Sequence, residues 1–297
     1  MRTLVTGATG LIGPRLVERL QRAVVLSRNP GGVHGLGTVD VHAWSPEVEP
    51  PPAEALADVT AVFNLAGEPV AGGRWTEERK RRIRDSRVLG TRNLVAGLAA
   101  QEHRPKVLVS ASAVGYYGDR GDQIIEESSP PGRDFLADVC REWEQEALAA
   151  EQLGIRVVCV RTGLVLAAAG GALAKMLPPF RLGMGGRIGS GEQWMPWIHI
   201  DDVVGILLHA SQDERVRGAI NAVSPTPATN AEFTRELGRA LHRPALLSIP
   251  RAALRLMFGE MSYVLTASQR TLPTAVERTG YTFEYPDLAP ALRAVLG

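Results

Sequence analysis

The sequence predicts an α/β protein built on a doubly wound parallel sheet. Short apolar runs recur along the first half of the 297-residue chain, and amphipathic helical segments separate them. The first run is followed by three glycines, Gly7, Gly10 and Gly13, in the order G-x-x-G-x-x-G. Apolar residues at helical spacing come next, so the chain begins as strand, glycine turn and helix.

The opening strand, Thr3-Leu4-Val5, leads into a turn in which each glycine has its own task. Gly7 permits the tight turn, Gly10 lets the backbone approach a pyrophosphate, and Gly13 lets the helix pack close to the strand. The helix is marked by the apolar residues Leu11, Ile12, Leu16 and Leu20. Its N-terminus offers free N–H groups to phosphates. The stretch therefore predicts a dinucleotide-binding turn.

Composition limits the class of protein. Hydrophobic residues make up 45% of the chain and charged residues 22%, as in ordinary globular proteins, and the net charge is +1. We therefore expect no nucleic-acid partner and no membrane partner. The two cysteines, Cys140 and Cys159, lie inside apolar stretches, which favours a reducing compartment over a disulfide framework or a metal site. No apolar run is long enough to span a membrane and the N-terminus enters a strand directly, so we expect a cytoplasmic protein without a signal peptide.

The second strand, Ala23 to Leu26, ends in Ser27 and Arg28. NAD-binding folds usually place Asp or Glu at this position to accept the ribose hydroxyls. This chain has no acidic residue between Glu18 and Asp40. A hydroxyl and a guanidinium suit a 2′-phosphate instead, so we expect NADP in preference to NAD.

The remaining elements of the first half alternate between strand and helix. Strands are expected at 39–42, 61–65, 106–110 and 157–161. Long helices are expected at 77–100, opened by Thr76, and at 134–153, capped by Asp134. The intervening segments 45–52 and 119–133 read as loops, and the second of them can cover a site.

The pattern loosens after Gly163. Gly170-Gly171 reads as a break, 178–191 as a loop, and helices are expected near 203–211, 230–241, 250–259 and the C-terminus. A strand at 219–223 is expected to join the sheet. We therefore predict a dinucleotide-binding domain over 1–165, completed by about 198–224, and a substrate lobe made of 166–197 and 225–297.

Hydroxyl and phenol groups follow the fifth strand, in the run from Ser110 to Gly118. Open parallel sheets bind ligands at the carboxyl ends of their strands. This run is therefore a candidate site, and Asn64-Leu65-Ala66-Gly67 ends the neighbouring strand with a glycine that leaves room for a cofactor.

Together with the opening turn, Asn64 to Gly67 and Ser110-Ala111-Ser112 resemble the extended branch of the short-chain dehydrogenase/reductase superfamily. More narrowly, the chain is similar to the atypical NAD(P)-dependent, sugar-nucleotide-epimerase-like family. Four further stretches carry this closer similarity: Gly72 to Trp75 with Ser86-Arg87 and Gly90-Thr91, then Val114 to Gly118, Trp194 to Asp202, and Ser262 to Pro286.

The resemblance implies a Rossmann domain with NADP across the strand ends and a C-terminal lobe over it. It places Ser112 at the active-site Ser/Thr position, Thr162-Gly163 beside the nicotinamide, and Arg87 on a helix facing the cofactor. Dimerisation through the two long helices is also implied. The expected cofactor-binding residues are Gly7, Thr9, Gly10, Leu11, Ile12, Ser27, Arg28, Leu65, Ala66, Gly67, Arg87, Ser110, Ala111, Thr162 and Gly163.

The chain departs from the superfamily at its general acid/base. The family uses Tyr in Y-x-x-x-K on the helix after the active-site Ser. If Glu144 is aligned with the family's usual acidic residue, Leu136 stands at the Tyr position and Cys140 at the Lys position. Leu carries no proton and a thiol supplies no ammonium charge, so the proton source is open.

Several residues are candidates for the missing roles. Ser112 can stabilise an oxyanion, and Tyr116 or Tyr117 can either supply the proton or form an aromatic wall. His199 can transfer a proton or serve as a structural hydrogen-bonding group. The candidates for substrate contact, each of which can equally be core or rim, are Trp75, Arg187, Trp194, Trp197 and His199.

Two functions follow from these residues. The first is an NADP-dependent oxidoreductase or epimerase-like enzyme on a small carbonyl or hydroxyl compound, including a nucleotide sugar. The second is an NADP(H)-binding sensor or partner-binding protein with little or no turnover. Loss of the Tyr and Lys functions favours the second, and the elaborate C-terminal lobe favours the first.

Overall fold

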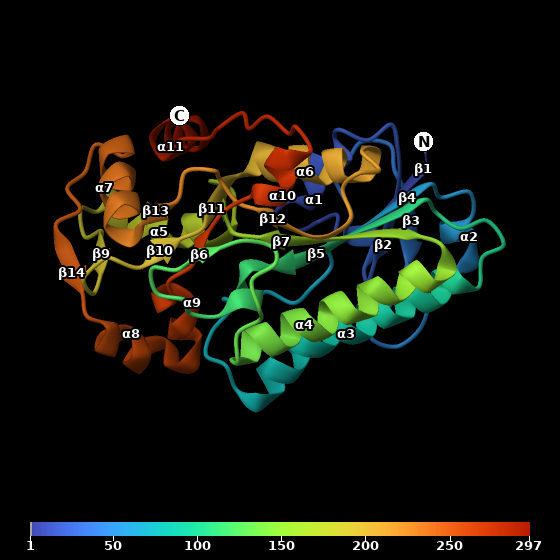
Figure 1. The fold of residues 1–297 in the computed structure, drawn as a ribbon, viewed down its shortest axis with the longest axis horizontal. Helices are drawn as coiled ribbons and strands as arrows, with labels where there is room; N and C mark the ends of the chain where they lie inside the picture. Colours follow the sequence, from blue (N-terminus) through green and yellow to red (C-terminus); the bar gives the residue numbers. More distant parts are fainter. Residues whose placement is uncertain (1) are drawn as a thin grey trace.

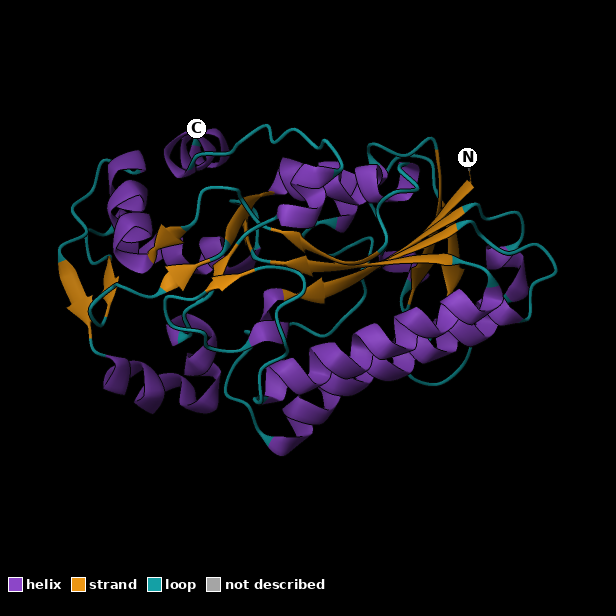
Figure 2. Cartoon of the chain, in the orientation of Figure 1, coloured by secondary structure: helices purple, strands orange, loops and turns teal. Residues whose placement is uncertain are grey.

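The computed structural model describes residues 2–297 and contains a seven-stranded parallel sheet between two layers of helices (Figure 2). The predicted fold class is therefore confirmed. In spatial order the strands are β12 (Gly218–Ala222), β7 (Arg156–Thr162), β5 (Val107–Ala113), β4 (Ala61–Asn64), β1 (Arg2–Thr6), β2 (Arg22–Ser27) and β3 (Asp40–Ala43). The strand expected at 219–223 joins the sheet as β12, beside β7.

The sheet strands read as continuous apolar runs because both faces of the sheet are buried. Val5, Phe63 and Val109 point into a core covered by α1 (Gly13–Val17) and α6 (Ile200–Gln212). Their neighbours Leu4 and Val62 point into a second core, on the opposite face. Alternate side chains of the five inner strands, β1, β2, β4, β5 and β7, therefore fill two separate cores.

The second core is covered by α3 (Glu77–Ala99) and α4 (Phe135–Leu148), which run side by side (Figure 1). Both helices begin as predicted. Thr76 accepts a hydrogen bond from the Arg79 amide, and Asp134 accepts from the amides of Leu136 and Ala137. These caps satisfy N–H groups that the first helical turn leaves unpaired.

A third core lies at the opposite end of the molecule from β3 (Figure 1). It is assembled from segments far apart in the sequence. The remaining helices are α2 (Ala53–Leu56) and α10 (Thr274–Arg278), which pack on the two sheet cores, and α5 (Gly171–Arg181), α7 (Asn230–Ala240), α8 (Arg251–Phe258), α9 (Tyr263–Thr266) and α11 (Leu288–Leu296). Of these, α5, α7 and α11 contribute to the third core.

Four two-stranded pairings connect the C-terminal segments to the rest. They are β8 (Leu164–Leu166) with β11 (Trp197–His199), β10 (Trp194–Met195) with β13 (Ala228–Thr229), β9 (Gly186–Ile188) with β14 (Leu247–Ile249), and β6 (Ile124–Ile125) with β15 (Arg270–Thr271). The last pairing brings the C-terminal region back onto the expected loop 119–133.

Besides short strands within the expected loops, the structure differs from the sequence prediction at the first helix, the fifth strand and the segment 171–181. The first helix is only the short α1, because the chain stays irregular through Ile12. The fifth strand continues to Ala113, which puts Ser112 on a strand. A helix, α5, occupies 171–181, where a break and a loop were expected. Leu173, Leu177 and Phe180 recur at helical spacing and are buried, and the two prolines lie in the last turn.

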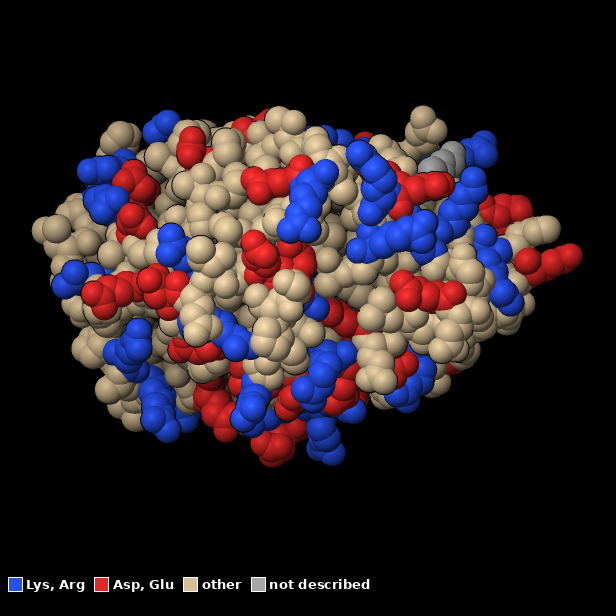
Figure 3. Space-filling view, viewed as in Figure 1, with Lys and Arg blue, Asp and Glu red and all other residues tan. Residues whose placement is uncertain are grey.

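Acidic and basic side chains are interspersed over the face of the molecule in Figure 3, in keeping with the net charge of +1. Among residues 2–297, no helix combines the length and apolarity needed to cross a lipid bilayer.

The close packing at Gly13 generates a stability prediction. A Cβ at this position would lie 2.4 Å from the carbonyl oxygen of Ala8, which is backbone and cannot rotate away. We expect Gly13→Ala to lower the free energy of unfolding by about 1–3 kcal/mol, the usual cost of overpacking. Urea unfolding measures this.

Gly31→Ala is the matched control, because its added Cβ would meet nothing closer than Asn29 Oδ1 at 3.8 Å. Equal stability of the two variants would contradict the role given to Gly13.

Candidate active site

The glycine turn lies at the carboxyl ends of β1 and β4. Gly7 has φ +69°, and a Cβ there would lie 2.7 Å from the carbonyl carbon of Leu65. The Thr6 hydroxyl accepts hydrogen bonds from the amides of Leu65 and Ala66, both at 3.1 Å. The segment after β4 is therefore fixed against the glycine turn.

The turn also leaves donors free. The Gly10 amide donates to the Gly7 carbonyl at 3.0 Å, whereas the amides of Leu11 and Ile12 make no backbone hydrogen bond within residues 2–297. Free amides beside closely packed glycines suit a pyrophosphate, so the turn fits a dinucleotide.

A buried row of polar side chains crosses the sheet at this edge. Thr6, Asn64 and Ser110 are neighbours in the strand register. Thr6 donates to Asn64 Oδ1 at 2.8 Å, and Asn64 Nδ2 donates to Thr91 at 2.8 Å and to Ser110 at 3.2 Å. The Trp143 indole N–H also donates to Thr91, at 2.9 Å. This row ties β1, β4 and β5 to both long helices.

A second row lies two residues further along, where Ser112, Arg161 and Asn221 are register partners on β5, β7 and β12. The Ser112 hydroxyl donates to Glu144 Oε1 at 2.6 Å. Arg161 donates to both oxygens of the same carboxylate, at 2.8 and 2.7 Å. Arg161 is 4% exposed and Glu144 6%, so the ion pair is buried. Burial disfavours the charged guanidinium, but the hydrogen bonds and charge of Glu144 hold the pKa of Arg161 above its ordinary value.

The two tyrosines after β5 have different surroundings. Tyr117 is fully buried; its hydroxyl donates to Asn221 Oδ1 at 2.7 Å and accepts from Arg161 at 2.9 Å. Desolvation raises the pKa of Tyr117 to about 12. Tyr116 is half-buried, with its ring centroid 3.5 Å from the guanidinium carbon of Arg161. The two phenols therefore differ in their access to solvent.

Helix α4 presents Leu136 and Cys140 toward this edge. A Cβ on Gly115 would lie 3.3 Å from Leu136 Cβ and 3.9 Å from Cys140 Sγ. Burial, followed by the charge of Glu144, raises the pKa of Cys140 to about 12. The thiol is therefore protonated at neutral pH and supplies no charge.

Ser27 and Arg28 lie at the end of β2. The Ser27 hydroxyl accepts a hydrogen bond from the Asn29 amide at 3.1 Å, and the Arg28 side chain is exposed. Among residues 2–297, no carboxylate lies within 4.0 Å of Arg28. Its guanidinium is thus available to a ligand at this end of the sheet.

Arg87 approaches the site from α3. A Cβ on Gly67 would lie 3.0 Å from its guanidinium carbon, so the arginine packs directly under the turn after β4. Thr162 ends β7 and Gly163 follows it, and Gly163 packs against the Pro196 carbonyl.

The expected substrate residues do not converge. Trp197 is 1% exposed in the third core, and the buried His199 caps α6 by accepting from the Asp201 amide at 3.2 Å. Both therefore have packing or capping roles. Arg187 is exposed on β9. The two remaining tryptophans are half-buried: Trp75 lies edge-on to Phe135, and Trp194 donates to Asp122 at 2.6 Å.

Sequence reasoning missed the roles of Thr6, Thr91, Trp143 and Asn221, and used Glu144 only to align a helix. One signal was available: Thr6 and Asn64 are the last residues of apolar strands, and Arg161 is the last but one of another. Such residues at adjacent strand ends are placed to share hydrogen bonds. The partners on the helices could not be identified from spacing.

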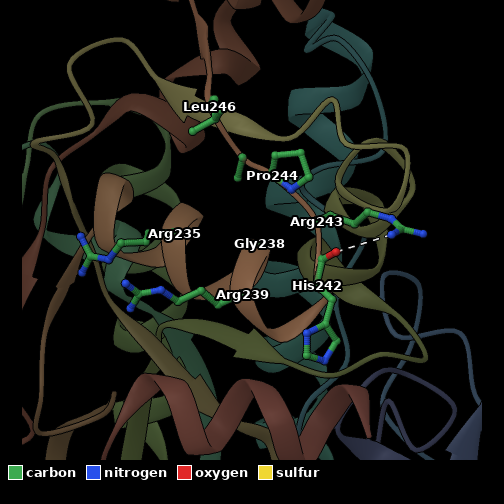
Figure 4. Close-up of a pocket in the computed structure, with 8 residues that line it drawn as sticks. Arg235, Gly238, Arg239, His242, Arg243, Pro244 and Leu246 are labelled. Atoms are coloured by element: carbon green, nitrogen blue, oxygen red, sulfur yellow. Dashed lines mark hydrogen bonds between the residues drawn. The ribbon is translucent and has the colours of Figure 1, made fainter.

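A cavity of about 530 Å³ opens beside α7, away from the strand ends; its lining includes Arg235, Arg239, His242 and Arg243. Figure 4 shows Arg235 and Arg239 pointing to one side and Arg243 to the other. The cations do not converge on one point.

Among residues 2–297, no cluster of three or more His, Cys, Asp or Glu side chains is placed to hold a metal ion.

The buried ion pair generates the next prediction. Glu144→Gln leaves the Arg161 charge buried without its counterion, so we expect the free energy of unfolding to fall by about 3–5 kcal/mol. Glu142→Gln is the control, because Glu142 pairs with Arg84 at the surface of the same helix. It is expected to cost less than about 1 kcal/mol. Urea unfolding of both variants measures the difference; equal losses would refute a special cost at Glu144.

Comparison with known proteins places this geometry in a family. Residues 3–222 match the NAD dependent epimerase/dehydratase family, and residues 249–295 match a domain of unknown function. The chain is 40% identical to an epimerase family protein SDR39U1 homolog, chloroplastic, of Arabidopsis thaliana, covering 100% of this chain and 87% of the relative. It is 38% identical to the human epimerase family protein SDR39U1, covering 100% of both chains.

A solved structure agrees with the sequence relationship. The crystal structure of human SDR39U1 (isoform2) with NADPH superposes with a TM-score of 0.89 at 36% identity, covering 100% of this chain and 99% of the human chain. The chain therefore belongs to the NAD dependent epimerase/dehydratase family and has the NAD(P)-binding short-chain dehydrogenase/reductase fold of its epimerase-family relatives.

Proposed function

We propose that this protein is an NADP-dependent oxidoreductase or epimerase-like enzyme acting on a small carbonyl or hydroxyl compound, including a nucleotide sugar. The observation that carries the proposal is that the glycine turn occurs together with a β2 strand that ends in Ser27 and the exposed Arg28 and has no acidic residue at its end. The NADPH of the human relative's structure supports the same choice of cofactor.

In this proposal different protein groups bind the two ends of the nucleotide. Arg28 pairs with the 2′-phosphate and the free amides of the glycine turn bind the pyrophosphate. The segments at Leu65 to Gly67, Ser110-Ala111 and Thr162-Gly163 surround the nicotinamide end. The bound nicotinamide supplies hydride chemistry.

The segments 166–197 and 225–297 form the substrate lobe in this proposal. The protein works in a reducing, cytoplasmic compartment, where Cys140 and Cys159 stay as buried free thiols.

The chain's own contribution to the reaction centres on Ser112. Its hydroxyl proton is directed at Glu144, and Arg161 fixes that carboxylate. The hydroxyl is thereby held in one orientation at the carboxyl end of β5. With its proton directed at Glu144, the hydroxyl can accept a hydrogen bond from a hydroxyl group of the substrate and cannot donate one to an oxyanion; because it is already fixed, no ordering is needed during the reaction.

A second function is favoured by a specific observation. The hydroxyl groups of Ser112 and Tyr117 both donate to protein acceptors, Glu144 and Asn221, and not to a ligand. Leu136 and the protonated Cys140 supply no substitute for the usual acid/base. A protein with these features suits an NADP(H)-binding sensor with little turnover. Incubating it with NADPH and a panel of aldehydes and ketones separates the two functions: an enzyme oxidises NADPH, whereas a sensor binds it without consuming it.

The cofactor assignment predicts the effect of Arg28→Ala. Loss of a charge-assisted hydrogen bond of about 1.5 kcal/mol is expected to weaken NADPH binding about tenfold and leave NADH binding nearly unchanged. Isothermal titration calorimetry with both nucleotides measures this. Arg22→Ala, at the opposite end of β2, is the control and should change neither affinity. An unaltered NADPH-to-NADH preference in Arg28→Ala would exclude the assignment.

The catalytic assignment predicts the effect of Ser112→Ala. We expect turnover to fall at least about tenfold, because the reacting hydroxyl group loses a hydrogen bond of about 1.5 kcal/mol to the fixed Ser112 oxygen, while NADPH still binds. Steady-state NADPH oxidation measures turnover, and calorimetry checks binding. Ser128→Ala, an exposed serine in the 119–133 segment, is the control. Equal turnover in wild type and Ser112→Ala would remove Ser112 from the reaction.

A further inference from the structure

Exposed apolar side chains gather where β9 and β14 pair, at the end of the molecule opposite β3 (Figure 1). Leu246 is 89% exposed and Leu182 is 71% exposed, and Met184 and Leu247 are exposed as well. We call these four side chains the Leu246 surface. Isolated exposed leucines are ordinary, whereas several exposed apolar residues on neighbouring segments are typical of an interaction site.

The four side chains come from the two segments that contain β9 and β14, and these segments run side by side. Leu247 and Gly186 are partners in the strand register. Before the strands begin, the Arg243 Nε donates to the Arg181 carbonyl oxygen at 3.0 Å. The two segments are therefore in contact at both places, and their exposed apolar residues belong to one end of the molecule.

Both segments come from stretches of the sequence without acidic residues. No Asp or Glu occurs in 152–191 or in 237–259, although the whole chain has 33 Lys and Arg and 32 Asp and Glu residues. Four exposed arginines lie on or beside the two segments: Arg181, Arg187, Arg243 and Arg251. Among residues 2–297, no carboxylate oxygen lies within 4.0 Å of any of them. The Leu246 surface therefore has a positive border that the described carboxylates leave unpaired.

The cavity of about 530 Å³ beside α7 adjoins this surface. Pro244, Ala245 and Leu246 form part of its lining. Figure 4 shows Pro244 and Leu246 together on one side of the cavity, with Arg235 and Arg239 of α7 apart from them. Because the arginine side chains do not converge, the cavity does not suit a single small anion. It suits the apolar side chains of a larger partner.

Shape and charge discriminate among partners for this surface. In an isologous contact between two copies of the chain, the Leu246 surface would face itself and bring like-charged arginines together. A flat lipid surface would leave the cavity beside Leu246 unfilled and lose its packing contacts. The three-residue β14 exposes few backbone groups, so an extended peptide added as a strand would have little to pair with. A helix with apolar and acidic side chains fits both the apolar surface and its positive border.

We propose that the Leu246 surface binds an amphipathic helix of another protein, one that carries acidic residues beside its apolar face. The apolar face packs on the four exposed side chains, and the carboxylates pair with the bordering arginines. Arg187, a substrate candidate from the sequence, is one of these arginines. The inference stands apart from the proposed function, because none of the candidate cofactor-binding or catalytic residues belongs to the Leu246 surface.

The test is fluorescence anisotropy of a labelled model peptide of about five helical turns, with Leu on one face and Glu on the rest. We expect the peptide to bind the full chain, and Leu246→Ser to weaken this binding at least about tenfold, since burial of one large apolar side chain is worth about that much affinity. Val48→Ser is the matched control, because Val48 is 79% exposed but lies outside the Leu246 surface. It should bind the peptide as wild type does.

Arg187→Glu tests the charges of the border. It is expected to weaken peptide binding about tenfold at low salt, and this loss is expected to shrink as salt rises, because salt screens exposed charges. Arg82→Glu reverses an exposed arginine on α3 and is the control, which should leave the affinity unchanged.

The inference is overturned if the peptide does not bind wild type, or if it binds wild type and Leu246→Ser equally. Two further results would overturn it by assigning the surface to another partner. One is binding of phosphatidylglycerol vesicles without binding of the peptide, and the other is a wild-type dimer that Leu246→Ser dissociates in sedimentation analysis. Thermal unfolding checks that the variants fold, and Leu182→Ser repeats the comparison if Leu246→Ser does not.

Discussion

The buried contact of Arg161 with Glu144 is the interaction on which the candidate active site depends. Both groups are withdrawn from water, and each is stable there only because the other is present. Arg161 comes from β7 and Glu144 from α4, so the ion pair fixes the helix against the sheet. The same guanidinium bonds the Tyr117 hydroxyl and stacks on Tyr116, while the carboxylate holds Ser112. One charge pair thus determines the positions of three candidate catalytic side chains.

A neutral network performs the same task at the cofactor side of the edge. Thr6, Asn64 and Ser110 are linked across three strands, and Thr91 and Trp143 continue the links into the two long helices. In each of these strands an apolar residue two positions earlier lies in the core on the same side of the sheet. Up to that residue the strands contribute only to the core. The polar residues that follow lie at the carboxyl ends of the strands, where open parallel sheets bind ligands.

The chemistry of the site depends on which hydrogen-bond donors and acceptors these contacts leave free. The hydroxyl groups of Ser112 and Tyr117 donate to Glu144 and Asn221, so neither has a proton free to donate to a ligand. Arg87, by contrast, presents donors and has no carboxylate partner among the described residues. Two hydroxyl groups of the site are therefore already used as donors, and the charge of Arg161 is balanced by Glu144.

The sequence by itself determined the parallel sheet, the glycine turn, and the caps at Thr76 and Asp134, because these depend on local spacing and on residues close together in the chain. Local pattern failed at α5, where tertiary burial of Leu173 and Phe180 outweighs the prolines and glycines around them. Only the tertiary structure decided that His199 is a helix cap and that Ser112 is bonded to a carboxylate 32 residues away. Such partners meet through strand register and helix packing, and a desolvated charge can be recognised only when everything packed around it is known.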